Sequence, residues 1–175
     1  MEIKDSGERR EFESGAVRDI AEGKGRCDLL PLQEVAMLFE NMVVPDTQKF
    51  KAKSVSLILR QLNKVIRRDD DDFIEPILSA IKIFMHTQYG SESIAIIELS
   101  KHYEEGAKKY KERNWEKGIP AHCYIDSCIR HLMKWYDGWS DEPHDRAVMW
   151  NLFGLMWTLI NKPECDDRPE RRNDT

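Results

Sequence analysis

Apolar residues recur at helical spacing over most of the chain. The first such run follows Pro31 and stops before Pro45, so we predict a helix that begins near Pro31, because proline favours the first turn of a helix and cannot continue one. Residues 48–68 repeat the pattern. The two predicted apolar faces consist of Val35, Leu38, Phe39 and Met42, and of Val55, Ile58, Leu59, Leu62 and Ile66.

Four more helices are predicted at about 73–87, 92–112, 121–137 and 142–161, with a loop at 114–120. Gly90 separates the first two of these, Gly138 ends the third, and Pro143 stands in the first turn of the last, which Pro163 ends. No segment shows convincing strand alternation, and no internal repeat is present. The pattern therefore predicts an all-α fold, a helical bundle of about six helices with an extended N-terminal arm.

The polar segments divide the chain into three parts. Residues 1–28 are predicted to form the extended arm, residues 29–163 a single all-α nucleotide-binding domain, and residues 164–175 a charged, frayed tail. The four consecutive aspartates at 69–72 could be mistaken for a metal site. Consecutive side chains point in different directions, however, so we interpret this run as a solvated loop that caps the next helix.

Composition limits the function classes. With 34% charged residues and a net charge of -5, the surface as a whole would repel nucleic acid, so we expect no duplex binding. No apolar run is long enough to cross a bilayer, and the N-terminus has no hydrophobic signal core, so we expect a cytoplasmic protein without membrane contact. The four cysteines show no zinc spacing and are expected to be free thiols, and no Cys-His nucleophile pattern is recognisable.

The most informative window runs from Tyr103 to Asn151, where cations alternate with aromatic, amide and imidazole side chains. Cations suit phosphates, flat rings suit a base, and carboxylates suit a metal ion, so this mixture favours a nucleotide ligand. The alternatives are ordinary surface ion pairs for the lysines and a core position for Trp115. The predicted nucleotide-binding residues are Lys24, Lys108, Lys109, Tyr110, Asn114, Trp115, Arg130, Arg146 and Asn151.

A candidate metal and catalytic site lies where the last two predicted helices meet. A short turn joins them, so they must be antiparallel neighbours, and their facing ends could gather carboxylates and imidazoles into one cleft. Such a set suits Mg²⁺ or Mn²⁺, and zinc less well. The alternative is a satisfied interhelical network. The predicted catalytic residues are Asp126, His131, Glu142 and His144, and the predicted metal ligands are Asp126, Glu142 and Asp145.

Several short motifs occur in a characteristic order at the two ends of the chain. They are Ser14-Gly15-Ala16-Val17-Arg18-Asp19, Gly23-Lys24, Asp28-Leu29-Leu30-Pro31, Gly106-Ala107-Lys108-Lys109-Tyr110, Asn114-Trp115, Asp126 with Arg130-His131, Trp150-Asn151, and the segment from Pro163 to Pro169. In these motifs the chain resembles phage and prophage proteins of the dATP/dGTP diphosphohydrolase N-terminal domain family. The resemblance leaves out residues 35–95, which we interpret as a lineage insertion.

The resemblance implies metal-dependent hydrolysis of purine (deoxy)nucleoside triphosphates to the monophosphate and pyrophosphate. It also implies an association with all-α MazG-like pyrophosphohydrolases and a homo-oligomer. The paired Glu-x-x-Glu and Glu-x-x-Asp motifs of that group do not appear cleanly. Two alternatives therefore stand beside the enzyme: a catalytically silent nucleotide-binding protein, such as a phage sponge for a host-defence signal, and a helical interaction module.

Overall fold

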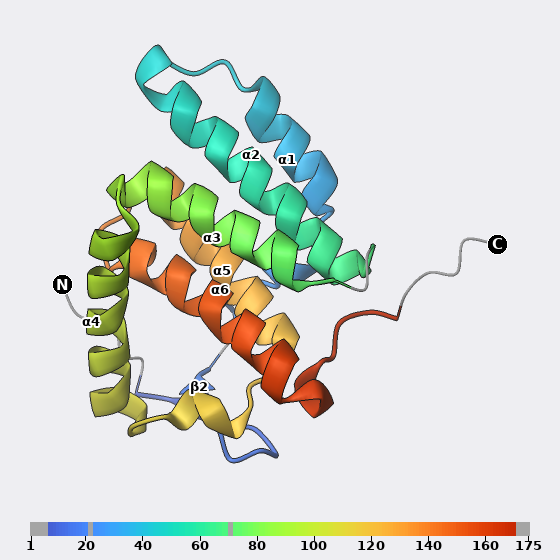
Figure 1. Ribbon diagram of the computed structural model, residues 1–175, viewed down its shortest axis with the longest axis vertical. Helices are drawn as coiled ribbons and strands as arrows, with labels where there is room; N and C mark the ends of the chain where they lie inside the picture. Colours follow the sequence, from blue (N-terminus) through green and yellow to red (C-terminus); the bar gives the residue numbers. More distant parts are fainter. Residues whose placement is uncertain (1–6, 21–22, 70–71, 171–175) are drawn as a thin grey trace.

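The computed structural model describes residues 7–20, 23–69 and 72–170 of the chain (Figure 1). Six α-helices dominate these residues, which confirms the predicted all-α fold. They are α1 (Leu32–Asn41), α2 (Asp46–Arg67), α3 (Ile74–Tyr89), α4 (Glu92–Tyr110), α5 (Ala121–Tyr136) and α6 (His144–Asn161), with short 3-10 turns η1 (Cys27–Leu29), η2 (Asn114–Lys117) and η3 (Pro163–Cys165). None of these helices is long and apolar enough to cross a membrane.

The bundle is built around α5 and α6, which pack against each other more extensively than any other pair. Helices α1 and α2 form an adjoining pair at one end, α3 lies between α2 and α6, and α4 flanks α6 (Figure 1). The core side chains come from every helix, and α5 is covered on most of its faces, since ten of its residues are buried. Polar side chains on α5 therefore lie in a protein environment.

Local sequence explains the helix ends. The oxygen Oδ1 of Asp72 accepts hydrogen bonds from the backbone N–H groups of Ile74, at 2.8 Å, and Glu75, at 3.3 Å. This confirms that the aspartate run caps the next helix; Asp70 and Asp71 lie outside the described residues. Helix α3 ends at Gly90, whose φ of 66° favours a residue without a Cβ.

The N-terminal segment contains two short strands, which the sequence pattern did not predict. Strands β1 (Arg9–Glu11) and β2 (Val17–Asp19) pair antiparallel, with Arg10 directly opposite Arg18. Each strand has three residues, which is too short for a recognisable alternation. Ala16 is fully buried, and the backbone of Val17 exchanges two hydrogen bonds with the Asn114 side chain. The hairpin is thereby held against the helical domain.

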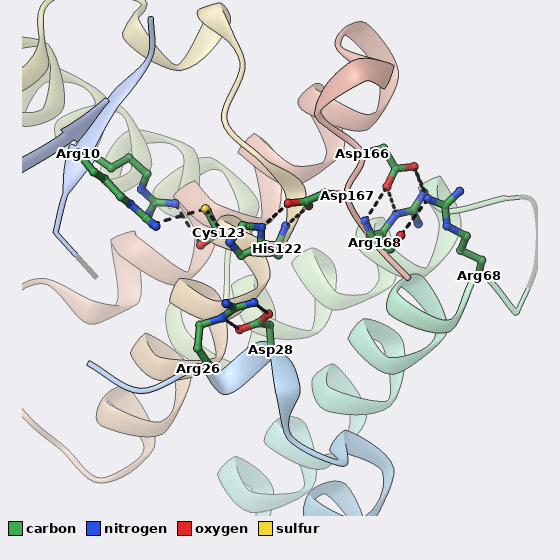
Figure 2. Close-up of polar contacts among 10 residues, drawn as sticks. Arg10, Arg26, Asp28, Arg68, His122, Cys123, Asp166, Asp167 and Arg168 are labelled. Carbon is green, nitrogen blue, oxygen red and sulfur yellow. Dashed lines mark hydrogen bonds and ion pairs between the residues drawn. The ribbon is translucent and has the colours of Figure 1, made fainter. Parts of the chain in front are cut away.

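The C-terminal segment also packs onto the bundle as far as residue 170. The buried Arg168 guanidinium donates to the Val65 carbonyl oxygen at 2.8 Å and pairs with Asp166 (Figure 2). Asp167 accepts a hydrogen bond from the His122 backbone N–H at 2.9 Å. The expected frayed tail is therefore ordered over these residues, because its charges have partners; residues 171–175 lie outside the described range.

Helix α6 meets α5 closely at Gly154. A Cβ added there would lie 2.3 Å from Cε1 of the Tyr124 ring, which is fully buried. We expect Gly154→Ala to lower the free energy of unfolding by roughly 1–3 kcal/mol, because overpacking outweighs the helix propensity of alanine. Urea denaturation measures the change.

The matched control is Gly106→Ala in α4, where an added Cβ meets nothing within 4 Å. Alanine should stabilise the protein there by up to about 1 kcal/mol, since only propensity changes. Equal effects of the two substitutions would contradict the close packing of α6 on Tyr124.

Candidate functional site

A pocket of about 510 Å³ lies between the N-terminal hairpin and helices α4, α5 and α6. It combines cationic, acidic, aromatic and imidazole side chains. The polar and aromatic residues that line it are Arg10, Arg18, Asp19, Lys24, His102, Tyr110, Asn114, Cys123, Asp126, Ser127, Arg130, His131, Lys134, Asp141, Glu142, Trp150 and Asn151.

Arg10 and Arg18 form the most unusual feature of this pocket. They are directly opposite each other in the hairpin, so both side chains point to the same face. Like charges in that position repel each other, and among residues 7–20, 23–69 and 72–170 no carboxylate forms an ion pair with either. Asp19, which also lines the pocket, pairs instead with Arg9 at 3.1 Å and with Lys109 at 2.8 Å. The pocket face therefore carries two cations that lack an anionic partner within the described chain.

The Arg18 guanidinium is held by neutral groups. It donates to the Cys123 carbonyl oxygen at 3.1 Å and to Oδ1 of Asn151 at 3.3 Å, and it lies over the rings of Tyr124 and Trp150. Burial lowers the pKa of Arg18, although an arginine keeps its proton. A partly buried cation of this kind is costly unless an anion compensates it, so the arrangement favours an anionic ligand.

Three further cations line the same pocket, namely Lys24, Arg130 and Lys134. Arg130 pairs with Asp126 and donates to the Lys24 carbonyl oxygen at 3.2 Å. The Lys24 ammonium also faces the pocket, and burial lowers its pKa. Together with the hairpin arginines, these groups give the pocket an electropositive wall.

His131, Glu142 and His144 bring three possible metal ligands together. The Nδ1 atoms of His131 and His144 are 2.9 Å apart, and Oε1 of Glu142 lies 3.9 Å from each of them. A point in the plane of these atoms lies about 2.1 Å from all three, which matches the distance from a transition metal to imidazole nitrogen and carboxylate oxygen. The donor set therefore fits one divalent ion.

The protonation of this cluster also fits a metal site. Nε2 of His144 lies 2.7 Å from Oδ1 of Asp141, so a proton on Nε2 leaves the lone pair of Nδ1 facing His131 and Glu142. Burial opposes the charge on Asp141, but hydrogen bonds from His144 and Lys134 outweigh it and lower the pKa of this carboxyl. Burial and the neighbouring His144 hold the pKa of His131 well below its usual value, so His131 is neutral as a ligand requires.

Of the residues that the sequence nominated, the structure places eight in the lining of this pocket. They are Lys24, Tyr110, Asn114, Asp126, Arg130, His131, Glu142 and Asn151, and His144 contacts His131. Asp126 is engaged on both oxygens: Oδ1 accepts from the Cys27 backbone N–H at 2.7 Å, and Oδ2 pairs with Arg130. The two hydrogen bonds of the Asn114 amide go to the Val17 backbone, so this amide holds the hairpin.

Apart from His144, five nominated residues do not line the pocket. Lys108 is 71% exposed and pairs with Glu104, and Lys109 pairs with Asp19 at 2.8 Å. Trp115 packs against Tyr103 and Trp157, as the core alternative predicted. Arg146 pairs with Glu98 at 2.6 Å, and Asp145 accepts from the Tyr89 hydroxyl at 2.7 Å. These contacts give each of the five a partner, and only the partner of Lys109, Asp19, itself lines the pocket.

Sequence reasoning missed Arg10, Asp19 and His102 and gave Arg18 no role. His102 is buried, its Nδ1 has no hydrogen-bond partner among the described residues, and burial lowers its pKa to about 4. Arg18 belongs to one of the motifs that carried the family resemblance, which was the only signal available. The apolar periodicity of the sequence could not identify these residues, because it does not show which pocket a polar side chain lines.

The fold and the site define an all-α protein with an electropositive pocket and an adjacent donor set for a divalent ion. Residues 82–168, about half of the chain, match the family described as "dATP/dGTP diphosphohydrolase, N-terminal", and through this segment the chain belongs to that family. No curated protein and no solved structure matches the chain significantly.

The family match corrects the bounds of the resemblance seen in the sequence. The matched segment begins inside α3 and includes α4, α5, α6 and Arg168. Residues 82–95, which we interpreted as part of an insertion, therefore belong to the family domain. The N-terminal motifs between Ser14 and Pro31 lie outside the matched range, although their segment forms one wall of the pocket.

Proposed function

We propose that this protein hydrolyses purine (deoxy)nucleoside triphosphates to the monophosphate and pyrophosphate with the help of a divalent metal ion. The observation that carries the proposal is the cross-strand pair of Arg10 and Arg18, which faces the pocket without a carboxylate partner in the described chain. A triphosphate supplies the missing negative charge. The family match adds support, because the name of the family describes this reaction.

The phosphates would bind to the electropositive wall. The Arg18 guanidinium is already oriented by the Cys123 carbonyl and the Asn151 amide, so little ordering is lost when an anion binds. Arg10, Lys24 and Arg130 would neutralise the remaining charge, including the charge that develops on the leaving pyrophosphate.

The base would lie against the aromatic side of the pocket. Tyr110 and Trp150 both line it and offer rings for stacking, and His102 offers an Nδ1 without a partner in the described chain. Asn114, which the sequence nominated to read the base edge, has its amide committed to Val17. We therefore assign the purine edge to His102, because its neutral ring can donate or accept a hydrogen bond.

The metal ion would be held by His131, Glu142 and His144. Two imidazoles with one carboxylate suit Mn²⁺ better than Mg²⁺, which prefers oxygen ligands. When bound, the ion supplies Lewis acidity toward the phosphates and an activated water. Asp141 keeps His144 in the required tautomer. Water oxygen adds to the α-phosphorus, and the bond from that phosphorus to the bridging oxygen breaks to release pyrophosphate.

The direct test is product analysis by ³¹P NMR. The full chain is incubated with dATP, dGTP, dCTP or dTTP in the presence of Mn²⁺ or Mg²⁺. We expect pyrophosphate and the monophosphate from the purine nucleotides, with Mn²⁺ more effective than Mg²⁺. Orthophosphate as the first product, or no turnover of any nucleotide, would refute the proposed reaction.

We also infer that the protein forms a homo-oligomer, as the resemblance implied. Exposed apolar side chains on α1 and α2, namely Met37, Leu38, Phe50 and Leu57, support this inference. The cytoplasmic location and the absence of duplex binding stay predictions from composition.

A further inference from the structure

A second group of reactive side chains meets at the start of α5, beside the nucleotide pocket. His122 and Cys123 are adjacent in the chain, and Asp167 approaches them from the C-terminal segment (Figure 2). Nε2 of His122 lies 3.3 Å from Sγ of Cys123, and Nδ1 of the same ring is bound to Oδ2 of Asp167. The group is thus a carboxylate, an imidazole and a thiol in series, which is the arrangement that activates a nucleophile.

The imidazole is fixed in position from two directions. Asp167 accepts from the His122 backbone N–H at 2.9 Å with one oxygen and binds the ring with the other. Hydrogen bonds with Asp167 and Cys123 raise the pKa of His122 to about 10, so the ring is protonated at neutral pH. A protonated ring next to sulfur can stabilise a thiolate and can later donate its proton.

The sulfur has further positive surroundings. Nη2 of Arg10 donates to Sγ at 3.4 Å, and Cys123 lies in the first turn of α5, where the helix dipole favours negative charge. The charged groups near this thiol are Arg10 and Arg18 from the hairpin, Arg26 from the segment before η1, His122 and Asp126 from α5, and Asp167. Four of these six groups are cationic.

Two pockets border Cys123. It lines both the nucleotide pocket and a second pocket of about 470 Å³, which Arg10, Arg26 and His122 also line. Its exposed fraction is only 1%, so we expect small reagents alone to reach the sulfur. Within the described part of the chain, the other three thiols have no histidine and carboxylate arranged in this way. Burial raises the pKa of Cys128 to about 12, and burial also raises the pKa of Cys27 and of Cys165.

We propose that Cys123 is a nucleophilic thiol, activated by His122 and Asp167, that small peroxides oxidise. The thiolate sulfur attacks one oxygen of hydrogen peroxide, and the O–O bond breaks. The leaving hydroxide takes the proton from Nε2 of His122 and becomes water. Sulfur is oxidised to sulfenic acid, the peroxide is reduced, and His122 is left neutral. Because Cys123 lines the nucleotide pocket, its oxidation adds an oxygen atom to that pocket. Only this effect on the nucleotide pocket rests on the proposed function.

The experiment compares the four thiols within one protein. The full chain is exposed to hydrogen peroxide for set times and then denatured in N-ethylmaleimide, and peptide mass spectrometry gives the fraction of each cysteine that no longer reacts. We expect Cys123 to be oxidised roughly ten times faster than Cys27 and Cys165, although both are more exposed, and Cys128 to stay reduced. Oxidation of Cys123 no faster than that of Cys165 would overturn the proposal.

His122→Gln provides the second comparison, because it keeps a side chain of similar polarity without the imidazole. Cys123 should then be oxidised about as slowly as Cys165, while Cys27 keeps its rate and Cys128 stays protected, which shows that the fold is intact. An unchanged rate at Cys123 would also overturn the proposal. No nucleotide is present in either measurement, so a failure of the proposed hydrolysis leaves this test valid.

Discussion

Replacing Arg18 by methionine should strongly weaken nucleotide binding while leaving the protein folded. Methionine keeps the apolar contacts with Tyr124 and Trp150 but removes the buried positive charge. Truncating one partner of a buried, hydrogen-bonded charge pair costs about 2–5 kcal/mol, so the affinity for a triphosphate should fall by roughly 100-fold or more. Calorimetric titration with a non-hydrolysable dATP analogue measures the loss.

For the stability of the protein without nucleotide, the same variant is expected to have no effect or the opposite effect. Removing a partly buried cation that has no carboxylate partner in the described chain should leave the unfolding free energy unchanged or raise it, since no desolvated charge remains. Arg67→Met is the matched control, because Arg67 is 57% exposed on α2 and lies outside the pocket lining. Undiminished nucleotide affinity in Arg18→Met would show that the hairpin does not bind the phosphates.

The second large effect is expected at the metal donor set. Glu142→Gln keeps the shape of the side chain but removes the charge that Oε1 offers beside His131 and His144. Mn²⁺ affinity should fall by about 100-fold, and nucleotide turnover should become undetectable. Asp141→Asn should weaken Mn²⁺ binding by roughly 10-fold, because Asp141 orients His144 and does not bind the ion itself.

The variant Asp145→Asn distinguishes the metal ligands assigned from the structure from those predicted from the sequence. The sequence nominated Asp145 as a ligand, whereas the structure commits its carboxylate to Tyr89 and Gln88. Titration of Mn²⁺ followed by electron paramagnetic resonance should therefore give wild-type affinity for this variant. Loss of Mn²⁺ binding in Asp145→Asn together with normal binding in Glu142→Gln would contradict the assigned donor set.

The helices were predictable because their signals are local. Apolar spacing located all six, and Pro31, Pro143 and Gly90 marked ends that the structure reproduces within a few residues. The antiparallel contact of α5 and α6 followed from the short turn between them, and with it the meeting of His131, Glu142 and His144. These three side chains meet because consecutive helices joined by a short turn lie side by side. A sequence shows which helices are consecutive, so this contact could be predicted.

The remaining site depends on contacts between distant segments, which local pattern cannot supply. Arg18 reaches Asn151 across 133 residues, and Asp167 reaches His122 across 45. The sequence analysis recognised no pattern of cysteine and histidine, whereas the structure brings Cys123, His122 and Asp167 into contact. His122 and Cys123 are neighbours in sequence, but their orientation depends on Asp167 and Arg10, which the fold brings to them.

The central claim is that the hairpin arginines and the two-histidine, one-carboxylate donor set hold a nucleotide triphosphate and its metal ion in one pocket. A crystal grown with Mn²⁺ and a non-hydrolysable dATP analogue tests it directly through the anomalous scattering of manganese. We predict a manganese peak between His131, Glu142 and His144, with a phosphate oxygen within hydrogen-bond distance of Arg18. A nucleotide bound outside this pocket, or manganese bound away from these three side chains, would contradict the account.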